Sequence, residues 1–249
     1  MRTPPISTPL EDGIVYPVRT AEDRAAFDDW FSSQRLVAVD TETTGVAFHA
    51  EVRLLQLSDA REAWVLEPSK AMDVVTELVF GDKLLIAHNA SFDALMLARL
   101  LCSDGEELAK AVMSFMSRFY DTYIAAHLID PRGAQEGGWS HSLKDQCKVH
   151  LGEGSIDPQS ALKARFKEMG LSMSRGFAEI PLWDEVYVRY SGVDPLLTFR
   201  LHEKFQVLHD SESFDNLFNF ETEVAAICAA MTARGIQVDV DWARKTLQE

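Results

Sequence analysis

Residues 36–45, Leu-Val-Ala-Val-Asp-Thr-Glu-Thr-Thr-Gly, carry the strongest indication of the fold. Its first part is apolar, as expected for a strand that is buried on both faces of a sheet. Asp40 and Glu42 follow two positions apart, so both carboxylates leave the same face of that strand. Like charges at this spacing raise each other's pKa unless a cation neutralises them. Taken alone, the stretch fits a metal-binding pair and an acidic turn closed by Gly45 equally well.

A second acidic motif, residues 88–93 (His-Asn-Ala-Ser-Phe-Asp), favours the metal-binding interpretation. It follows residues 83–87, which are predicted to form another buried strand, and Ser91 is a candidate cap for the next helix. Asp93 then lies in the first turn of that helix, close to the strand end. His88 is interpreted as a buried histidine with satisfied hydrogen bonds rather than as a metal ligand.

The third motif is residues 190–194, Tyr-Ser-Gly-Val-Asp, in a stretch over 182–209 that predicts one or two long helices. Tyr190 and Asp194 are four residues apart and share a face if the helix is continuous. Pro195 cannot donate a backbone hydrogen bond, so a kink or a helix restart is expected there. In that case Asp194 would cap the second helix, a position from which it can still bind a metal.

Together the three motifs supply carboxylates and a phenol in a set suited to holding two divalent cations around a phosphodiester. Oxygen-only ligands favour Mg²⁺ or Mn²⁺. Two such cations, about 4 Å apart, would activate a water and stabilise the leaving 3′ oxygen of an in-line displacement. A tyrosine hydroxyl can hold the attacking water by hydrogen bonding without ionising. The motifs therefore predict two-metal phosphodiester hydrolysis without a covalent intermediate.

The composition limits the partners of the chain. Its 249 residues carry a net charge of −15, which argues against tight binding of a nucleic-acid duplex by this chain alone, because phosphate affinity comes mainly from Lys and Arg. A nuclease is not excluded, since bound cations offset acidic charge locally. No apolar run reaches the length of a membrane span, and residues 1–16 lack the order of a secretory signal. A soluble, intracellular protein without a membrane partner is expected.

The remaining pattern predicts an α/β fold with a mixed sheet of about five strands flanked by helices. Residues 1–20 are expected to form an irregular lead-in, because prolines break any periodicity. Residues 21–210 are assigned to one main domain and 211–249 to a helical segment of different character. Further strands are expected at 52–58, 63–66 and 118–120, and a loop is expected at 171–181.

The three motifs resemble those of the DEDD exonucleases, which have a ribonuclease H-like fold, in the branch whose third motif carries tyrosine. The sister branch has a histidine five positions before the last aspartate, where this chain has Arg189. The resemblance implies that Tyr190 positions the attacking water and that Thr43 and Phe92 contact the terminal nucleotide. The metal-site residues that it implies are Asp40, Glu42, Asp93 and Asp194.

A second resemblance concerns the segments between and after the motifs. Residues 121–122 (Asp-Thr) and 142–144 (Ser-Leu-Lys) are similar to the inter-motif part of family A DNA polymerases. Residues 221–239 are similar to the segment that opens the polymerase domain in that family. The resemblance implies the proofreading exonuclease domain of a phage or bacterial DNA polymerase. It also implies a cytoplasmic location in a bacterium or phage-infected cell, and a polymerase domain in the same or another chain.

The leading hypothesis is a Mg²⁺- or Mn²⁺-dependent 3′–5′ exonuclease that removes nucleoside monophosphates from single-stranded or frayed DNA 3′ ends. A ribonuclease D-like enzyme that trims RNA is the enzymatic alternative, because the same site hydrolyses either polymer. A module that keeps the fold and binds nucleic acid without cutting is the other alternative. The carboxylates count against that module, since a silent copy has no evident need to maintain their repulsion.

Overall fold

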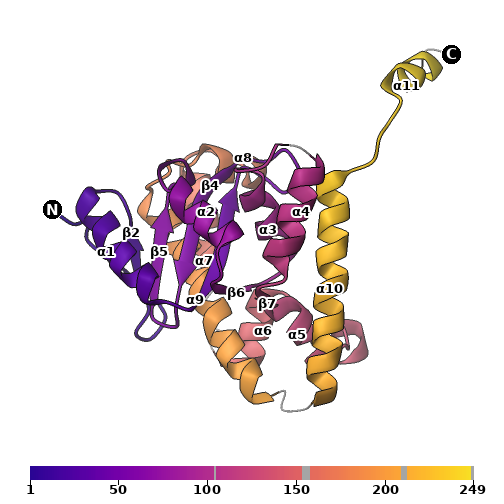
Figure 1. Ribbon diagram of the computed structural model, residues 1–249. Coiled ribbons are helices and arrows are strands. Elements are labelled where there is room, and N and C mark those ends of the chain that lie inside the picture. Colours follow the sequence, from indigo (N-terminus) through magenta and orange to yellow (C-terminus); the bar gives the residue numbers. More distant parts are fainter. Residues whose placement is uncertain (104, 153–157, 209–211, 248–249) are drawn as a thin grey trace.

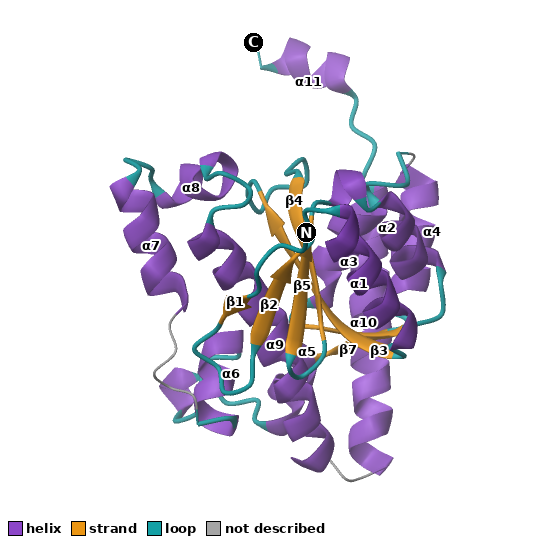
Figure 2. Cartoon of the chain, turned by 90° about the vertical axis from the view of Figure 1, so that its left-hand side faces the viewer, coloured by secondary structure: helices purple, strands orange, loops and turns teal. Residues whose placement is uncertain are grey.

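One mixed sheet of seven strands lies at the centre of the computed structural model, which describes residues 1–103, 105–152, 158–208 and 212–247 (Figures 1 and 2). The strands are β1 (Ile6–Ser7), β2 (Ile14–Pro17), β3 (Leu36–Thr43), β4 (Val52–Ser58), β5 (Glu62–Leu66), β6 (Leu84–Ala87) and β7 (Phe119–Asp121). The helices are α1 (Ala21–Ser33), α2 (Met72–Phe80), α3 (Ala90–Ala98), α4 (Gly105–Met116), α5 (Thr122–Ile129), α6 (Leu143–His150), α7 (Pro158–Glu168), α8 (Met173–Glu179), α9 (Glu185–Leu208), α10 (Glu212–Arg234) and α11 (Val240–Thr246).

The strand order across the sheet is β1-β2-β5-β4-β3-β6-β7. Strand β4 runs antiparallel to both β3 and β5, whereas β6 runs parallel to β3 and β7 runs parallel to β6. The strands from β5 to β7 therefore form the expected mixed sheet, and the acidic strand β3 is at its centre. Pairing with β4 extends along residues 38–43, so the pleat sets the direction in which the acidic side chains leave.

Residues 1–20 are not the irregular lead-in that was expected, because two short strands form between the prolines. Strand β2 pairs in parallel with β5, and β1 pairs antiparallel with β2. Pro17 is the last residue of β2, and Val15 of the same strand is fully buried. Prolines are tolerated at strand ends and sheet edges. The sheet is thus wider by two strands than the sequence pattern indicates.

Helices cover both faces of the sheet (Figure 1). On one face, helices α1 to α4 and α10 share a core with Val37 and Val39 of β3. On the other face, α6, α7 and α9 share a second core with Leu54 of β4. Because side chains alternate along a strand, Asp40 and Glu42 leave β3 on the side of α9. The two acidic side chains of β3 therefore lie on the same side of the sheet as the third motif, which is in α9.

Helix α9 is continuous through Pro195, so the helix does not restart there. Val193 and Leu197, on either side of the proline, are both buried against the second core. Packing of both halves on one sheet face offsets the backbone hydrogen bond that proline cannot donate. Tyr190 and Asp194 consequently lie on one unbroken helix.

The segment 171–181, expected to be a loop, contains the short helix α8. Gly176 of this helix lies against the ring of Phe166 in α7, where an added Cβ would be 2.4 Å from Cδ2. Only a glycine permits this approach. The helix is thus stabilised by a tertiary contact that the local sequence pattern does not reveal.

Gly192 lets α9 lie close against β2, and its replacement is expected to destabilise the protein. A Cβ added there would be 2.5 Å from Cγ2 and 2.6 Å from Cγ1 of the buried Val15. Gly192→Val is expected to lower the free energy of unfolding by about 2–3 kcal/mol, as overpacked core substitutions do. Urea unfolding followed by circular dichroism measures the loss. Gly45→Val is the matched control, since a Cβ there meets no described atom within 4 Å; an equal loss in both variants would contradict the argument.

Helix α10 packs against α4 and α3 (Figure 1). It places Ala226, Ala229 and Ala233 in the core of the main domain. The segment assigned a different character, 211–249, contributes to that core through α10, whereas α11 extends away from it. The expected boundary at 210/211 lies outside the described residues.

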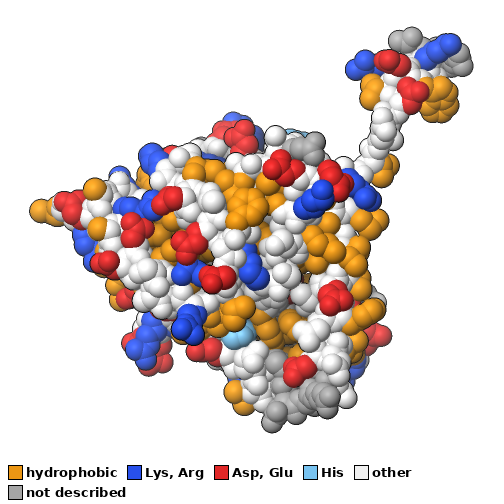
Figure 3. Space-filling model, in the orientation of Figure 1, with side chains coloured by type: hydrophobic (Ala, Val, Ile, Leu, Met, Phe, Trp, Pro, Cys, Tyr) orange, Lys and Arg blue, Asp and Glu red, His pale blue; other side chains and the backbone are white. Residues whose placement is uncertain are grey.

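Hydrophobic side chains gather on the outer side of α10 (Figure 3). They follow helical spacing and each is more than a third exposed: Leu217, Phe220, Val224, Ile227 and Met231. A contiguous apolar surface of this kind marks an interaction site more often than a solvated face.

Candidate active site

Strand β3 and helix α9 bring three of the expected carboxylates together. The charges of Glu42 and Asp194 both act on Asp40, and the charge of Asp194 acts on Glu42. Glu42 is only 7% exposed. The first and third motifs, which lie about 150 residues apart in the sequence, therefore meet on the α9 side of the sheet.

Tyr190 and Asp194 act directly on each other. The Tyr190 hydroxyl partly offsets the rise in the pKa of Asp194, and Gln159 of α7 has the same effect on the pKa of the phenol. The pairing of Tyr190 with Asp194 expected from the third motif is thus present, whereas Gln159 carried no recognisable signal. Asp194 Oδ1 is buried and has no hydrogen-bond partner among the described residues. An unpartnered, buried carboxylate oxygen fits a divalent cation, since hard cations prefer oxygen ligands.

The second motif is held at the sheet end by Asp121, a residue without an expected structural role. Helix α3 begins at Ala90, and its cap is Asn89 in the left-handed region (φ 70°) rather than Ser91. Asp121 accepts hydrogen bonds from the backbone amides of Asn89 and Ala90, both at 2.9 Å. It also caps α5 through the amide of Tyr123 at 2.8 Å. One carboxylate therefore fixes two helix starts beside β6 and β7.

Asp93 approaches β3 from the opposite side. Its Oδ1 accepts a hydrogen bond of 2.6 Å from Thr41 Oγ1, on the face that α3 covers. Its charge still raises the pKa of Asp40. The four carboxylates thus surround one strand from two sides. Among the described residues, no three His, Cys, Asp or Glu side chains lie close enough together, as they stand, to hold a metal ion.

Burial raises the pKa of all four carboxyl groups. It is the largest cause in each case and brings the pKa of Asp93 to about 7 and that of Asp194 to about 6. The pKa values of Asp40 and Glu42 are raised well above the usual range, and repulsion by neighbouring carboxylates adds to the effect of burial. Near neutral pH this group therefore favours either protons or cations.

Two basic side chains lie next to the carboxylates. Lys144 Nζ at the start of α6 is 5.9 Å from the centre of the Tyr190 ring, and its charge partly offsets the rise in the pKa of Asp194. Arg53 of β4 has the same effect on Glu42. Lys144 belongs to a segment that the sequence resemblance includes. Arg53 gave no signal, because its role depends on the register of β4.

The residues expected to contact the terminal nucleotide lie at the edge of this group. Thr43 Oγ1 donates to the carbonyl of Gly45 at 2.6 Å, so its hydroxyl stabilises the turn that ends β3. Phe92 is half-buried and lines a groove together with Val46.

His88 is the buried histidine that was expected: its nitrogens contact Thr122 Oγ1 and the His141 carbonyl, and burial lowers its pKa to about 4.

Asp93→Asn is expected to stabilise the metal-free protein at high pH. The pKa of Asp93 rises from 3.8 to about 7 on folding, so its contribution to stability is complete below about pH 4 and is lost as the pH rises through 7. Asparagine keeps an acceptor for Thr41 and does not ionise. In EDTA at pH 8 the variant should melt at least about 3 °C higher than the parent protein.

The comparison at pH 4.5 provides the control for this prediction. At that pH Asp93 is largely protonated in the folded state, so the two proteins should have similar melting temperatures. An unchanged gap between pH 4.5 and pH 8 would contradict the argument.

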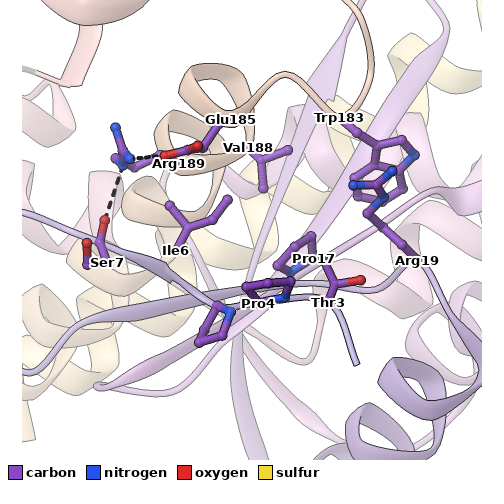
Figure 4. A pocket seen from close by; sticks show the side chains of 11 residues that line it. Thr3, Pro4, Ile6, Ser7, Pro17, Arg19, Trp183, Glu185, Val188 and Arg189 are labelled. Carbon is purple, nitrogen blue, oxygen red and sulfur yellow. Dashed lines mark hydrogen bonds and ion pairs between the residues drawn. The ribbon is translucent and has the colours of Figure 1, made fainter. Parts of the chain in front are cut away.

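A separate pocket lies between the N-terminal strands and the start of α9 (Figure 4). Arg189 lines it, donating to the Ser7 carbonyl at 3.1 Å and pairing with Glu185. On the opposite wall, the Arg19 guanidinium lies 5.7 Å from the centre of the Trp183 ring. None of the expected site residues is among the described residues that line it. Arg189 occupies the position where the sister branch has a histidine, and it lies in this separate pocket. Tyr190 is the residue beside the carboxylates.

The mixed strand order, with the acidic strand β3 at its centre, fits a ribonuclease H-like fold. Residues 18–209 match the family described as 3′–5′ exonuclease, the exonuclease domain of family A DNA polymerases, and the chain belongs to this family. The expected fold class and enzyme class are thereby confirmed.

Similarity to individual proteins agrees with this family. A DNA polymerase of Mycobacterium phage L5 is 30% identical over 241 residues, which cover 93% of this chain and 39% of that protein. This chain therefore spans less than half the length of that relative. The Escherichia coli RNase D structure has a TM-score of 0.61 and 16% identity, covering 94% of this chain and 54% of that chain. Brucella melitensis NrnC has a TM-score of 0.59 and 21% identity, covering 82% of this chain and 87% of that chain.

Proposed function

We propose that this chain is a divalent-cation-dependent 3′–5′ exonuclease that shortens single-stranded or frayed DNA from its 3′ end and releases nucleoside monophosphates. The observation that carries the proposal is the buried group of Asp40, Glu42 and Asp194, with Tyr190 acting on Asp194 from the same helix. Buried like charges destabilise a fold. Their concentration at the end of a central strand is therefore best explained by a catalytic use of the charge.

The cation-binding role is assigned to Asp40, Glu42, Asp93 and Asp194. The oxygen-only donor set and the unpartnered Oδ1 of Asp194 support it. Divalent cations bound there would supply a water of lowered pKa and stabilise the leaving oxygen. A Brucella melitensis NrnC structure described with bound Mg²⁺ has the same fold, with a TM-score of 0.53 and 18% identity. This favours Mg²⁺ over Mn²⁺.

Tyr190 is assigned the positioning of the attacking water. Burial and the charges of Asp194 and Glu42 raise the pKa of its phenol far above the usual range, so the hydroxyl stays neutral. A neutral phenol donates and accepts hydrogen bonds but does not remove a proton. The ring is buried in the second core and the hydroxyl acts on Asp194, so the hydroxyl can orient a water at little entropic cost.

DNA is the proposed substrate because the similar relatives are DNA polymerases. RNA trimming is the second candidate, since RNase D shares the fold and NrnC, another neighbour, is described bound to pGG. Incubation with matched 5′-labelled DNA and RNA oligonucleotides, with Mg²⁺ and with EDTA, separates the two. A ladder from the 3′ end of DNA only, lost in EDTA, is expected. Preferred RNA digestion would establish the second candidate, and no digestion with Mg²⁺ or Mn²⁺ would favour a binding module.

The biological role proposed is proofreading, with a polymerase domain in the same or another chain. The exposed apolar side of α10 supports a protein neighbour, and the relatives are DNA polymerases more than twice the length of this chain. Among the described helices, none has the length and apolar character to cross a membrane. The cytoplasm of a bacterium or a phage-infected cell is the proposed location.

A further inference from the structure

Gln56 is a polar side chain that is completely buried in the centre of the sheet. It interrupts an apolar run on β4, residues 54–57 (Leu-Leu-Gln-Leu), and has no exposed surface. Neither Nε2 nor Oε1 of its amide has a hydrogen-bond partner among the described residues. An unpaired buried amide destabilises a fold, and most buried polar groups in proteins have a partner. Packing alone therefore gives no reason for a glutamine at this position.

The register of the sheet places Gln56 directly opposite Asp40. The two residues pair across β3 and β4, so their side chains leave the same face and their Cβ atoms are about 5 Å apart. Leu55 and Leu57, on either side of Gln56 in the chain, belong to the core on the other face. Gln56 thus lies on the α9 side, next to the carboxylate on which the other three act.

The remaining neighbours of Gln56 on this face include one more polar group. Val65 is its partner on β5, and Leu54 and Ser58 are two positions away along β4. Ser58 is fully buried as well, its Oγ has no partner among the described residues, and its partners on both adjacent strands are alanines. The Ser58 hydroxyl can donate to Oε1 of Gln56, which turns Nε2 toward Asp40.

We propose that Gln56 is a positioning residue of the cation site: in the cation-bound protein its Nε2 donates a hydrogen bond to the carboxylate of Asp40 and fixes the direction of that carboxylate. The inference deepens the proposed function and rests on the cation-binding role assigned above. Carboxylates that bind metals are in turn hydrogen-bonded by neighbouring groups, which orient them. A neutral donor suits this position, because it stabilises the carboxylate and, unlike a lysine, does not compete with a cation.

Gln56→Met tests this inference, because it keeps the length of the side chain and removes both polar atoms. The variant loses two unpaired atoms from the interior, so in EDTA it should melt at the temperature of the parent protein or higher. Its Kd for Mn²⁺, measured from the electron paramagnetic resonance of the free ion, should rise by about tenfold or more. The kcat for a 5′-labelled single-stranded DNA should fall with little change in KM, since the proposed role acts through Asp40.

Gln146→Met is the matched control. Gln146 is also buried, but its Nε2 donates to the Ser140 carbonyl at 2.9 Å. This variant should melt about 2–4 °C lower than the parent protein, because a made hydrogen bond is lost, and its Kd for Mn²⁺ should be unchanged. Ser58→Ala removes the donor that orients the amide of Gln56, so it should raise the Kd by a smaller factor than Gln56→Met.

The two possible failures give different results. A lower melting temperature of Gln56→Met in EDTA, or an unchanged Kd for Mn²⁺, would overturn the inference, because the amide would then serve the fold. A parent protein that binds Mn²⁺ in a manner dependent on Gln56 but cleaves no DNA would uphold the positioning role and refute the exonuclease function. DNA cleavage by the parent protein, together with an unchanged Kd in the variant, would refute the positioning role alone.

Discussion

Asp40→Asn is expected to reduce the exonuclease rate by about 10³-fold or more, because it removes charge from the centre of the carboxylate group. Asp40 is the residue on which Asp93, Asp194 and Glu42 all act. The substitution keeps the shape of the side chain and removes a buried like charge. The folded protein should therefore be at least as stable as the parent in EDTA. Shortening of a 5′-labelled single-stranded DNA with Mg²⁺ measures the loss.

Asp29→Asn is the matched control for this substitution. Asp29 is an exposed aspartate on α1, on the opposite side of the sheet from α9, so the same chemical change there should leave the rate unaltered. A stable Asp40→Asn protein that retains most of its activity would contradict the assignment of the catalytic centre.

Tyr190→Phe is expected to lower kcat by about 10²-fold with little change in KM. The substitution removes only the hydroxyl, which acts on the pKa of Asp194, and the ring continues to pack in the second core. Because the phenol is neutral in the proposed role, the parent and the variant should have pH–rate profiles of the same shape. Steady-state kinetics between pH 6 and 9 measure both quantities.

Tyr187→Phe separates water positioning from general effects of a lost hydroxyl. Tyr187 lies on the same helix, is fully buried and has the Arg53 guanidinium 5.6 Å from its ring centre. The Tyr187→Phe variant should have a kcat close to that of the parent protein. Equal losses in the two variants, or a Tyr190→Phe profile displaced in pH, would refute the positioning role.

Sequence patterns predicted most helices and strands well, because apolar periodicity and helix caps depend on residues close together in the chain. The apolar run before Asp40 is strand β3, and the strand expected at 52–58 has those limits. Ser142 caps α6 as expected, through its side chain and the Asp145 amide. The errors occurred where long-range contacts decide the outcome. Two strands form in residues 1–20 because β5 offers an edge, and α9 continues through Pro195 because both halves are buried.

The candidate site follows the same division. The identity of the five catalytic candidates came from motif spacing, and their roles stay predictions. Helix continuity, which spacing alone left open, places Tyr190 and Asp194 on one helix, where the phenol acts on the pKa of Asp194. The approach of Asp93 from the far side of β3, through Thr41, has no signal in the sequence. The same is true of Gln159, whose contact with Tyr190 depends on how α7 packs.

Residue types and their spacing already indicate the chemistry proposed for this protein: an acidic central strand, two further acidic motifs in order, and membership of an exonuclease family. These are properties of residue type and spacing, which the chain carries before it folds. Folding is needed to set which side of β3 each carboxylate occupies and which basic side chains lie beside it. It also places α10 along the groove that Phe92 lines. Such features arise from packing between elements far apart in sequence, and burial there sets the pKa values on which the proposed catalysis depends.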